Sequence, residues 1–380
     1  GGRHYCFRRL PMGLSSSPGW CERFLTVIDH ELQRLGVRAV RYVDDFLFIA
    51  ASPQEVRRAM DITRVVLTEH GLLLNEKKTE GPSQRIVFLG LGIDSVQQAI
   101  FVPSDKRSDL FAVIGSLHNS KFVSRRQLQS VAGKFNFVAT ALPGARPFMR
   151  RLIDAVRGLP APQARTTMTQ EMQDDLQAWR HWLTRWDGRA RWCVGERVVI
   201  THDSSLTGFG FHLSALPADF DSRRLPEALQ QGNGYAGLYD GVHVAPARRS
   251  IQYGELFAMV TSVAMFAPYL QDCAVLLETD NETDVAILNR QSTACPDLLP
   301  LLRGLYATCA HYNIDVLARH LPGELNILAD FLSRPKKHAH STRVPVHIAA
   351  DTRIHHILSS KLSLAATGES PLTVVRFSTS

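Results

Sequence analysis

Two adjacent carboxylates, Asp44 and Asp45, lie between two short runs of mainly apolar, strand-forming residues, 40–43 and 46–49. This pattern predicts a β-hairpin whose turn carries both acids. Neighbouring negative charges repel each other, and a divalent cation such as Mg²⁺, which prefers carboxylate oxygens, would neutralise them. Paired cations can clamp the attacking and leaving oxygens of a phosphoryl transfer. A solvated Asp-Asp turn is the alternative, and the pair alone does not exclude it.

Four more acids are spread over residues 196–335. Asp203 and Asp280 each come at the end of an apolar, strand-like run, whereas Glu255 and Asp330 lie in expected helices. Ordinary roles compete with catalysis here, because an acid at a strand end can form a turn and Glu255 would favour the positive end of a helix dipole. The set forms the second candidate site of the chain.

The neighbours of these acids have structural interpretations. His202 directly precedes Asp203, so it should point to the opposite face of its strand and serve structure. Glu278, Glu282 and Asp284 surround Asp280, and we expect them to be structural or solvated.

Composition limits the class of protein. A chain of 380 residues can bury at least two cores, and its formal net charge of +7 favours a polyanionic partner. The six cysteines form no C-x-x-C pair, which argues against a structural zinc site and a disulfide framework. No apolar run approaches the roughly 20 residues that span a bilayer, and no signal peptide is visible. We therefore expect an intracellular protein, cytoplasmic or nuclear, with no membrane partner.

Hydrophobic spacing predicts amphipathic helices over 18–35, 54–70 and 172–186. The stretch 103–158 is helical and rich in arginine and lysine, which suits contacts with the phosphates of a duplex. An ordinary helical linker domain is the alternative. Residues 215–246 are rich in Gly, Pro and Asp and predict a loop or variable insertion.

Four segments occur in a telling order around the Asp-Asp pair: L-P-M-G-L-S-S-S-P at 10–18, Y-V-D-D at 42–45, L-N-E-K-K-T at 74–79 and F-L-G-L-G-I at 88–93. Together they resemble the palm of a reverse transcriptase from an LTR-type or related retroelement. The resemblance implies that Asp44 and Asp45 are catalytic and hold metal ions. It also implies contacts with nucleotide or nucleic acid from Met12, Gly13, Tyr42, Lys77, Leu89 and Gly90.

The palm resemblance has two departures. No carboxylate precedes Pro11, so the sequence begins about where the strand with the third aspartate of such a palm should end. Ser17-Pro18 replaces the usual Ala-Pro. We therefore expect the 380 residues as given to extend a primer poorly.

The later acids resemble the ribonuclease H domain that is fused to retroelement reverse transcriptases. The phrase H-L-P-G-E-L-N-I-L-A-D-F-L-S-R at 320–334 is close to the C-terminal signature of that family. The resemblance implies two Mg²⁺ (or Mn²⁺) ions, and one metal would activate water while the other stabilises the 3′ oxygen. The implied ligands are Asp203, Glu255, Asp280 and Asp330, and His320 would assist proton transfer or product release.

We therefore expect an α/β protein that combines an α+β palm fragment, a helical thumb and connector, and a ribonuclease H-like α/β domain. The expected segments are a partial reverse transcriptase palm (1–95), a thumb-like helical region (96–160), a linker and connector helix (161–195), a ribonuclease H-like domain (196–335) and a mobile tail (336–380).

The function so predicted is that of the C-terminal part of a retroelement polymerase, of a tyrosine-recombinase-type or pararetrovirus-like lineage. An RNA-directed DNA polymerase palm fragment would be fused to a two-metal ribonuclease H that cleaves RNA in RNA–DNA hybrids. Expected partners are RNA–DNA hybrid and template–primer, with dNTP if a fuller palm is present. A catalytically inactive nucleic-acid-binding relic or domesticated fragment is one alternative, and a DNA-cleaving nuclease of the same fold is another.

Overall fold

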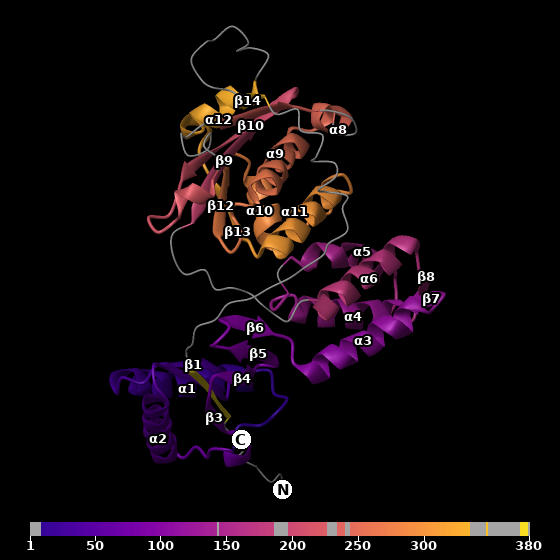
Figure 1. Ribbon diagram of the computed structural model, residues 1–380. Coiled ribbons are helices and arrows are strands. Elements are labelled where there is room, and N and C mark those ends of the chain that lie inside the picture. The colour runs from indigo at the N-terminus through magenta and orange to yellow at the C-terminus, as the bar shows by residue number, and fades with distance from the viewer. Residues whose placement is uncertain are drawn as a thin grey trace. The chain divides into compact units, whose positions relative to one another are not determined.

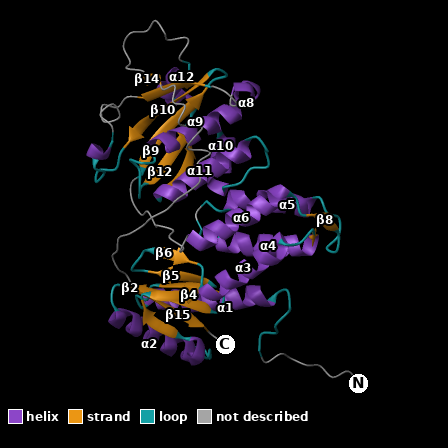
Figure 2. Cartoon of the chain, turned by 45° about the vertical axis from the view of Figure 1, so that its right-hand side comes forward, coloured by secondary structure: helices purple, strands orange, loops and turns teal. Residues whose placement is uncertain are grey.

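The computed structural model describes residues 9–142, 144–185, 197–225, 234–239, 244–334, 347–348 and 373–378. The chain forms two compact units that divide between residues 106 and 107, and the described residues 373–378 near the C-terminus belong to the first unit. Both units mix helices and strands, as the predicted α/β class requires (Figures 1 and 2). Among the described helices, none combines the length and the apolar character that crossing a bilayer demands.

The first unit is built on a four-stranded antiparallel sheet with the order β1-β2-β15-β3. The predicted hairpin is confirmed, since β1 pairs with β2 and Tyr42 lies opposite Asp45. Alternation along β2 buries Phe46 and Phe48 against α1 and α2. The bounds are β1 Ala39–Tyr42, β2 Asp45–Ala50, β3 Glu80–Ser83, β15 Thr373–Ser378, α1 Ser17–Arg34 and α2 Pro53–Glu69.

The other face of β2 carries Leu47, which packs against Ile86 and Phe88. These last two belong to a three-stranded antiparallel sheet of β4 (Arg85–Phe88), β5 (Leu91–Asp94) and β6 (Ala99–Phe101). Leu89 and Gly90 connect β4 to β5 with φ angles of 48° and 80°. Two consecutive positive φ angles are typical of the tight turn of a two-residue hairpin. The short helix η1 (Glu76–Lys78) lies within the L-N-E-K-K-T segment at 74–79.

The second unit begins with a helical layer. Phe135 of α4 stacks on Trp179 of α6 with 4.1 Å between ring centroids. Trp179 and Trp182 are buried, so both pack within the protein, whereas Trp186 lies outside the described residues. The helices are α3 Ser104–His118, α4 Arg125–Val138, η2 Arg146–Met149, α5 Arg150–Arg157 and α6 Gln170–Arg185.

The expected linker within 161–195 is in part a strand. β8 (Arg165–Thr167) pairs with β7 (Phe122–Ser124), and the Arg125 amide donates to the Ala164 carbonyl at 2.9 Å. The two β-branched threonines of β8 suit an extended backbone. The proline-rich composition concealed this pairing because its partner lies some forty residues away.

A six-stranded sheet with the order β13-β12-β9-β10-β11-β14 forms the rest of the second unit. β9, β10 and β11 are antiparallel neighbours, whereas β12 and β13 lie parallel to β9 on its other side. The strands are β9 Val198–Ser204, β10 Gly208–Ala215, β11 Gly234–Leu238, β12 Ala274–Thr279, β13 Asp315–His320 and β14 His347–Ile348.

Helices cover both faces of this sheet. The long apolar helix α9 is buried along most of its length, and its Phe257 and Phe266 contact Phe209 and Phe211 of β10. Gly210 lies between these two phenylalanines, so it faces the opposite side, where α12 packs. The helices are α8 Val244–Arg249, α9 Ile251–Phe266, α10 Glu282–Arg290, α11 Leu298–Tyr312 and α12 Ile327–Ser333, with short η3 Ser222–Arg224 and η5 Gly323–Leu325.

Two sequence expectations need comment here. The predicted loop at 215–246 is wrong in part, because β11 lies within it and α8 begins at its end; β11 pairs with β10 although it contains glycines at 234 and 237. The predicted mobile tail at 336–380 lies outside the described residues, except for β14 and β15.

Asp284, in the first turn of α10, is fully buried rather than solvated. Among the residues that the structure describes, none partners either of its oxygens at hydrogen-bonding geometry. Burial raises the pKa of Asp284 to about 7, and the nearby Gln252 amide opposes the rise only in part. The folded protein therefore favours the neutral carboxyl.

Asp284 should make stability depend on pH. The unfolded chain releases this proton near pH 3.9, but the folded chain keeps it to about pH 7. The stability that the neutral carboxyl provides is therefore complete below pH 4 and is lost as the pH rises to 7. Asp284→Asn should melt at a higher temperature than the wild type at pH 7.5, by the equivalent of roughly 4 kcal/mol, and the gap should shrink toward pH 4.5.

Glu282→Gln is the matched control, because Glu282 is exposed in the same helical turn. Its melting temperature should follow the wild type at every pH. A pH-independent difference between Asp284→Asn and the wild type would contradict the assignment.

Candidate functional site

Three of the predicted acids converge at one edge of the six-stranded sheet. Asp203 near the end of β9, Glu255 in α9 and Asp280 directly after β12 offer carboxylate oxygens that all lie within 4.8 Å of one another. β9 and β12 are parallel neighbours, so their carboxyl ends meet at the same edge. Sheet topology thus brings Asp203 together with Glu255 and Asp280, which lie 52 and 77 positions further along the sequence.

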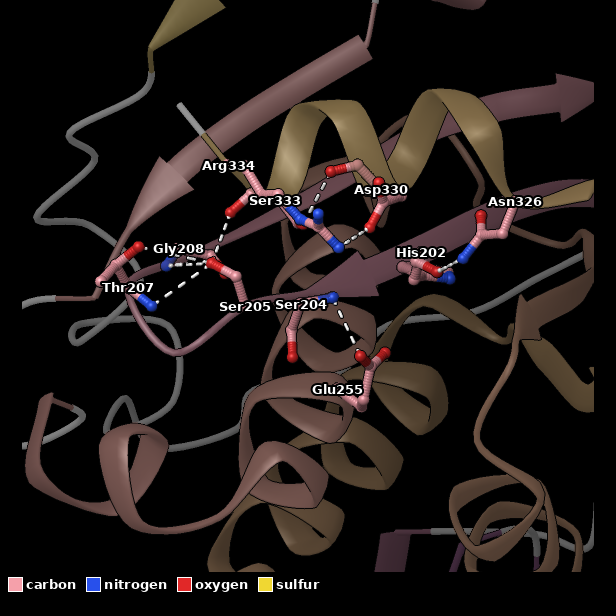
Figure 3. A network of polar contacts seen from close by, with 10 residues as sticks. All are labelled: His202, Ser204, Ser205, Thr207, Gly208, Glu255, Asn326, Asp330, Ser333 and Arg334. Carbon is pink, nitrogen blue, oxygen red and sulfur yellow. Dashed lines mark hydrogen bonds and ion pairs between the residues drawn. The ribbon is translucent and has the colours of Figure 1, made fainter. Parts of the chain in front are cut away.

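Local contacts aim Glu255 at this edge. The Ser204 amide donates to one of its oxygens at 3.0 Å, and the Thr279 hydroxyl donates to the other at 3.3 Å (Figure 3 shows the Ser204 contact). The preceding Gly254 lets α9 approach β9, because a Cβ there would lie 2.6 Å from the Ser204 hydroxyl. Glu255 is therefore fixed from both neighbouring strands.

The carboxylates disturb one another electrostatically. Burial raises the pKa of Glu255 to about 9, and the charges of Asp203 and Asp280 add to the rise. Burial also raises the pKa of Asp203 to about 6, with the Ser333 side chain opposing it and Asp330 and Asp280 adding to it. Without a cation, Glu255 therefore retains its proton at neutral pH.

Asp330, the fourth predicted acid, lies on α12 next to the cluster. Its charge acts on Asp203, but its own carboxylate is paired with the Arg334 guanidinium one turn later. Figure 3 shows this pair on α12. The described structure thus brings three acids into one group and places the fourth beside them in an ion pair.

Two glycines, Gly210 and Gly323, lack a side chain where other parts of the chain pack closely against them. A Cβ at Gly210 would come within 2.4 Å of the Leu332 Cβ and 2.7 Å of the Ala329 carbonyl oxygen, so α12 packs directly on bare backbone. A Cβ at Gly323 would lie 3.4 Å from the Asp280 carboxylate, so the 320–325 loop passes close to the cluster.

His320 ends β13, directly opposite Thr279 of β12, and its side chain is exposed. Since Thr279 bonds to Glu255, this register places His320 beside the cluster rather than within it. Its role stays a prediction.

The neighbours predicted to be structural have defined contacts. His202 is buried on the opposite face from Asp203, with its ring nitrogens at 2.6 Å from the Ser262 hydroxyl and 3.2 Å from the Glu278 carbonyl. Burial lowers the pKa of His202 to about 3, so the ring is neutral. Glu278 is buried, accepts from Thr201 at 3.0 Å and pairs with Arg319. These contacts tie β9, β12, β13 and α9 together behind the cluster.

The donors present suit a hard divalent cation. Carboxylate oxygens are the ligands that Mg²⁺ and Mn²⁺ prefer. The Asp203 Oδ2 atom is buried and has no hydrogen-bond partner among the described residues, as expected of an oxygen reserved for a metal. Asp203, Glu255 and Asp280 would hold the ion, and Asp330 would join them once Arg334 moves aside.

The Asp44–Asp45 pair lies in a different environment. Asp44 is exposed at the hairpin turn and Asp45 is half-buried at the start of β2. The preceding Val43 has a φ of 53°, a conformation that a β-branched residue rarely adopts. Strain of this kind persists only where the surroundings impose it.

Arg41, which the sequence analysis did not single out, supplies that restraint. Its guanidinium donates to the Val43 carbonyl at 2.9 Å, and it binds the carboxylates of Asp29 and Glu22 on α1 at 2.6 Å and 2.9 Å. The Arg41 side chain is only 6% exposed. Its position three residues before an Asp-Asp turn is the one signal that the sequence offered.

The six predicted nucleotide-contacting residues remain predictions. Met12 is fully exposed, and Gly13 has a φ of 87° in the turn before α1, where Ser17 donates to the Pro11 carbonyl at 2.6 Å. Tyr42 and Lys77 are exposed. Leu89 and Gly90 occupy the β4–β5 turn described above.

Comparison with known proteins supports the first unit's assignment. Residues 1–93 match the family model described as reverse transcriptase (RNA-dependent DNA polymerase). The expected resemblance to a retroelement reverse transcriptase is confirmed, and the hairpin with Asp44 and Asp45 lies inside the matched segment.

Two viral proteins match stretches of this chain that are longer than the reverse transcriptase segment. Protein P of Duck hepatitis B virus (strain China) is 28% identical over 158 residues, which make up 41% of this chain and 20% of that protein. The Gag-Pro-Pol polyprotein of Human T-cell leukemia virus 2 is 25% identical over 183 residues, or 47% of this chain and 12% of the polyprotein. The matches thus span about a fifth or less of the length of these relatives.

Among solved structures, a foamy viral protease-reverse transcriptase in complex with an RNA/DNA hybrid covers 90% of this chain and 41% of its own. The sequence identity is 15% and the TM-score is 0.44.

Metal binding at the acid cluster should be measurable by thermal shift. Mn²⁺ at about 100 times its Kd should stabilise the second unit by roughly 2.7 kcal/mol, which corresponds to a rise of several degrees in melting temperature. Asp280→Asn should abolish the rise, since it removes one ligand charge. Without metal this variant should be at least as stable as the wild type, because it also removes repulsion. Asp297→Asn, at an exposed site, should respond to Mn²⁺ normally; loss of the shift in both variants would contradict the site.

Gly210→Ala tests the placement of α12. The new methyl group would force α12 away from β10, so we expect a loss of about 1–3 kcal/mol in the free energy of unfolding and weaker Mn²⁺ binding. Gly115→Ala in α3 is the control, since a Cβ there meets nothing within 4 Å, and it should stabilise the helix by up to about 1 kcal/mol. Unchanged Mn²⁺ affinity in Gly210→Ala would show that Asp330 does not take part.

Proposed function

We propose that the 197–334 region is a metal-dependent nuclease of the ribonuclease H type, joined to the reverse transcriptase segment, and that it cleaves the RNA strand of RNA–DNA hybrids. The observation that supports this best is the convergence of Asp203, Glu255 and Asp280 from β9, α9 and β12, with Asp330 beside them. The sheet order and the presence of a reverse transcriptase segment in the same chain support the substrate class.

The residues would divide the work as follows. Two divalent cations, when bound, supply an activated water and stabilise the departing 3′ oxygen. Asp203 and Asp280 would bind them, and Glu255, fixed by Ser204 and Thr279, keeps its oxygens aimed at the cluster. Asp330 completes the set after it releases Arg334. His320, exposed on the adjacent strand, accepts or delivers a proton at the edge of the site.

We also propose that Asp44 and Asp45 belong to a metal site for RNA-directed DNA synthesis on a template–primer with dNTP. The family match of the surrounding residues supports this, as does the restraint of the turn by Arg41. Restraint of a strained turn suits a site that must present two carboxylates in one orientation.

Cleavage of a hybrid by the whole 380-residue chain tests the nuclease. With Mn²⁺ or Mg²⁺, the wild type should cut the RNA strand of a 5′-labelled RNA–DNA hybrid. Asp280→Asn keeps the shape of the side chain but removes its charge, so turnover should fall by at least about 10²-fold. His320→Ala should slow the reaction less, because this histidine is not a metal ligand.

Asp297→Asn serves as the matched acid-to-amide control and should cut like the wild type. Cleavage of a DNA duplex of the same sequence in preference to the hybrid would favour a DNA-cleaving nuclease instead. Hybrid binding without cleavage by a well-folded wild type would favour a non-catalytic binding protein.

A further inference from the structure

Asp175 of α6 is a fully buried carboxylate that neither proposed site uses. Its side chain is 0% exposed, and one oxygen pairs with the guanidinium of Arg303 on α11. The Arg151 amide donates to its other oxygen at 3.2 Å, and the Arg151 guanidinium lies 3.6 Å away. Since α6 belongs to the helical layer and α11 packs on the nuclease-like sheet, the Asp175–Arg303 pair joins these two parts of the second unit.

Further close contacts surround this pair. We call the contact between the helical layer and α11, with Asp175 and Arg303 at its centre, the joint. Arg303 also donates to the Pro147 carbonyl at 3.3 Å and lies over the Phe148 ring, 5.1 Å from its centroid. Beside it, Gly144 has a φ of 75°, and a Cβ there would lie 2.7 Å from the Tyr306 Cβ. The Tyr306 hydroxyl in turn donates to the Leu288 carbonyl at 2.6 Å. The joint therefore extends from the helical layer through α11 to α10.

A buried ion pair is a poor means of gaining stability alone. Removing two charges from water is so unfavourable that well-packed apolar residues of similar volume often stabilise a protein equally well or better. Such a pair instead restricts orientation, because a guanidinium group donates hydrogen bonds in a fixed planar geometry and fits only certain arrangements of acceptors. Arg303 meets two acceptors, on η2 and α6, and so restricts how the layers can be oriented.

The net charge of the helical layer indicates what kind of partner it attracts. Residues 107–185 contain twelve arginines and lysines against five aspartates and glutamates. This excess of seven equals the formal net charge of the whole chain, so attraction to a polyanion is concentrated in the helical layer. A duplex that touches both this layer and the acid cluster would gain from their fixed spacing, since the second contact becomes intramolecular.

We propose that Asp175 and Arg303 are positioning residues that hold the basic helical layer and the nuclease site in one orientation, so that both grip the same RNA–DNA hybrid. The choice of hybrid rests on the proposed nuclease function. The joint acts on substrate binding and leaves the chemistry at Asp203, Glu255 and Asp280 unchanged.

Asp175→Asn separates this proposal from simple electrostatics. The substitution adds one positive charge to the protein, so bulk attraction alone would tighten binding of a polyanion. Loosening the joint should instead weaken binding of a 30-base-pair hybrid whose RNA strand carries 2′-O-methyl groups and so resists cleavage, measured by fluorescence anisotropy with Mn²⁺ present, by at least about tenfold. KM for hybrid cleavage should rise to the same extent, with kcat within about twofold of the wild type, the pattern of lost uniform binding.

Asp154→Asn is the matched control. It changes the charge equally in the same layer but breaks only the more exposed pairs with Arg150 and Arg157, so hybrid affinity should stay the same or increase slightly. If Asp175→Asn does not fold, Arg303→Lys decides, because it keeps the charge and loses the fork. Its hybrid affinity should also fall and its kcat persist.

Folded Asp175→Asn or Arg303→Lys protein that binds hybrid as tightly as the wild type would overturn the proposal. So would a fall in kcat at unchanged KM, which indicates only a smaller folded fraction. The anisotropy arm needs no turnover, so a wild type that binds hybrid without cutting it would refute the nuclease while leaving the joint testable. A wild type that binds no hybrid refutes the joint's proposed role.

Discussion

Mutual repulsion among Asp203, Glu255 and Asp280 is the constraint on which the second unit depends. Two of the three are buried, where a negative charge loses hydration and feels its neighbours strongly. Parallel pairing of β9 with β12 brings two of them to one edge, and α9 delivers the third. The buried contacts of His202 and Glu278 then prevent the strands from separating. In the absence of a cation, protons and Arg334 reduce the repulsion.

The first unit solves a similar problem at its surface. Asp44 and Asp45 project at a hairpin turn, where water screens their charges, so little burial is needed to tolerate them. What must be controlled there is direction, and the control is local: a strained Val43 and an arginine fixed by two acids of α1. The two candidate centres therefore differ in kind. One depends on long-range sheet topology, and the other on a network that spans about twenty residues.

Sequence reasoning succeeded where a pattern was local or a residue type was diagnostic. Alternation predicted the hairpin around Asp44 and Asp45, and helical period predicted helices over 18–35, 54–70 and 172–186, which the structure has at 17–34, 53–69 and 170–185. It failed at β8, which prolines precede, and at β11, which contains two glycines, because such composition resembles a loop until a partner strand is present. It also took Asp284 to be structural or solvated without foreseeing its complete burial, and it missed the Asp175–Arg303 pair. Burial and pairing of this kind are decided by elements far away in the chain.

The absence of a side chain at Gly210 has a consequence for ion selectivity. Because α12 rests on bare backbone, the depth at which Asp330 approaches the cluster is decided by a residue with no functional group. Mg²⁺ needs oxygens at about 2.0–2.1 Å, whereas Ca²⁺ accepts them at about 2.3–2.6 Å. A helix seated a few tenths of an ångström higher would thus enlarge the cage by the difference between these ionic radii. Selectivity for Mg²⁺ over Ca²⁺ would then depend on the position of α12 as much as on the acids that would bind the ion.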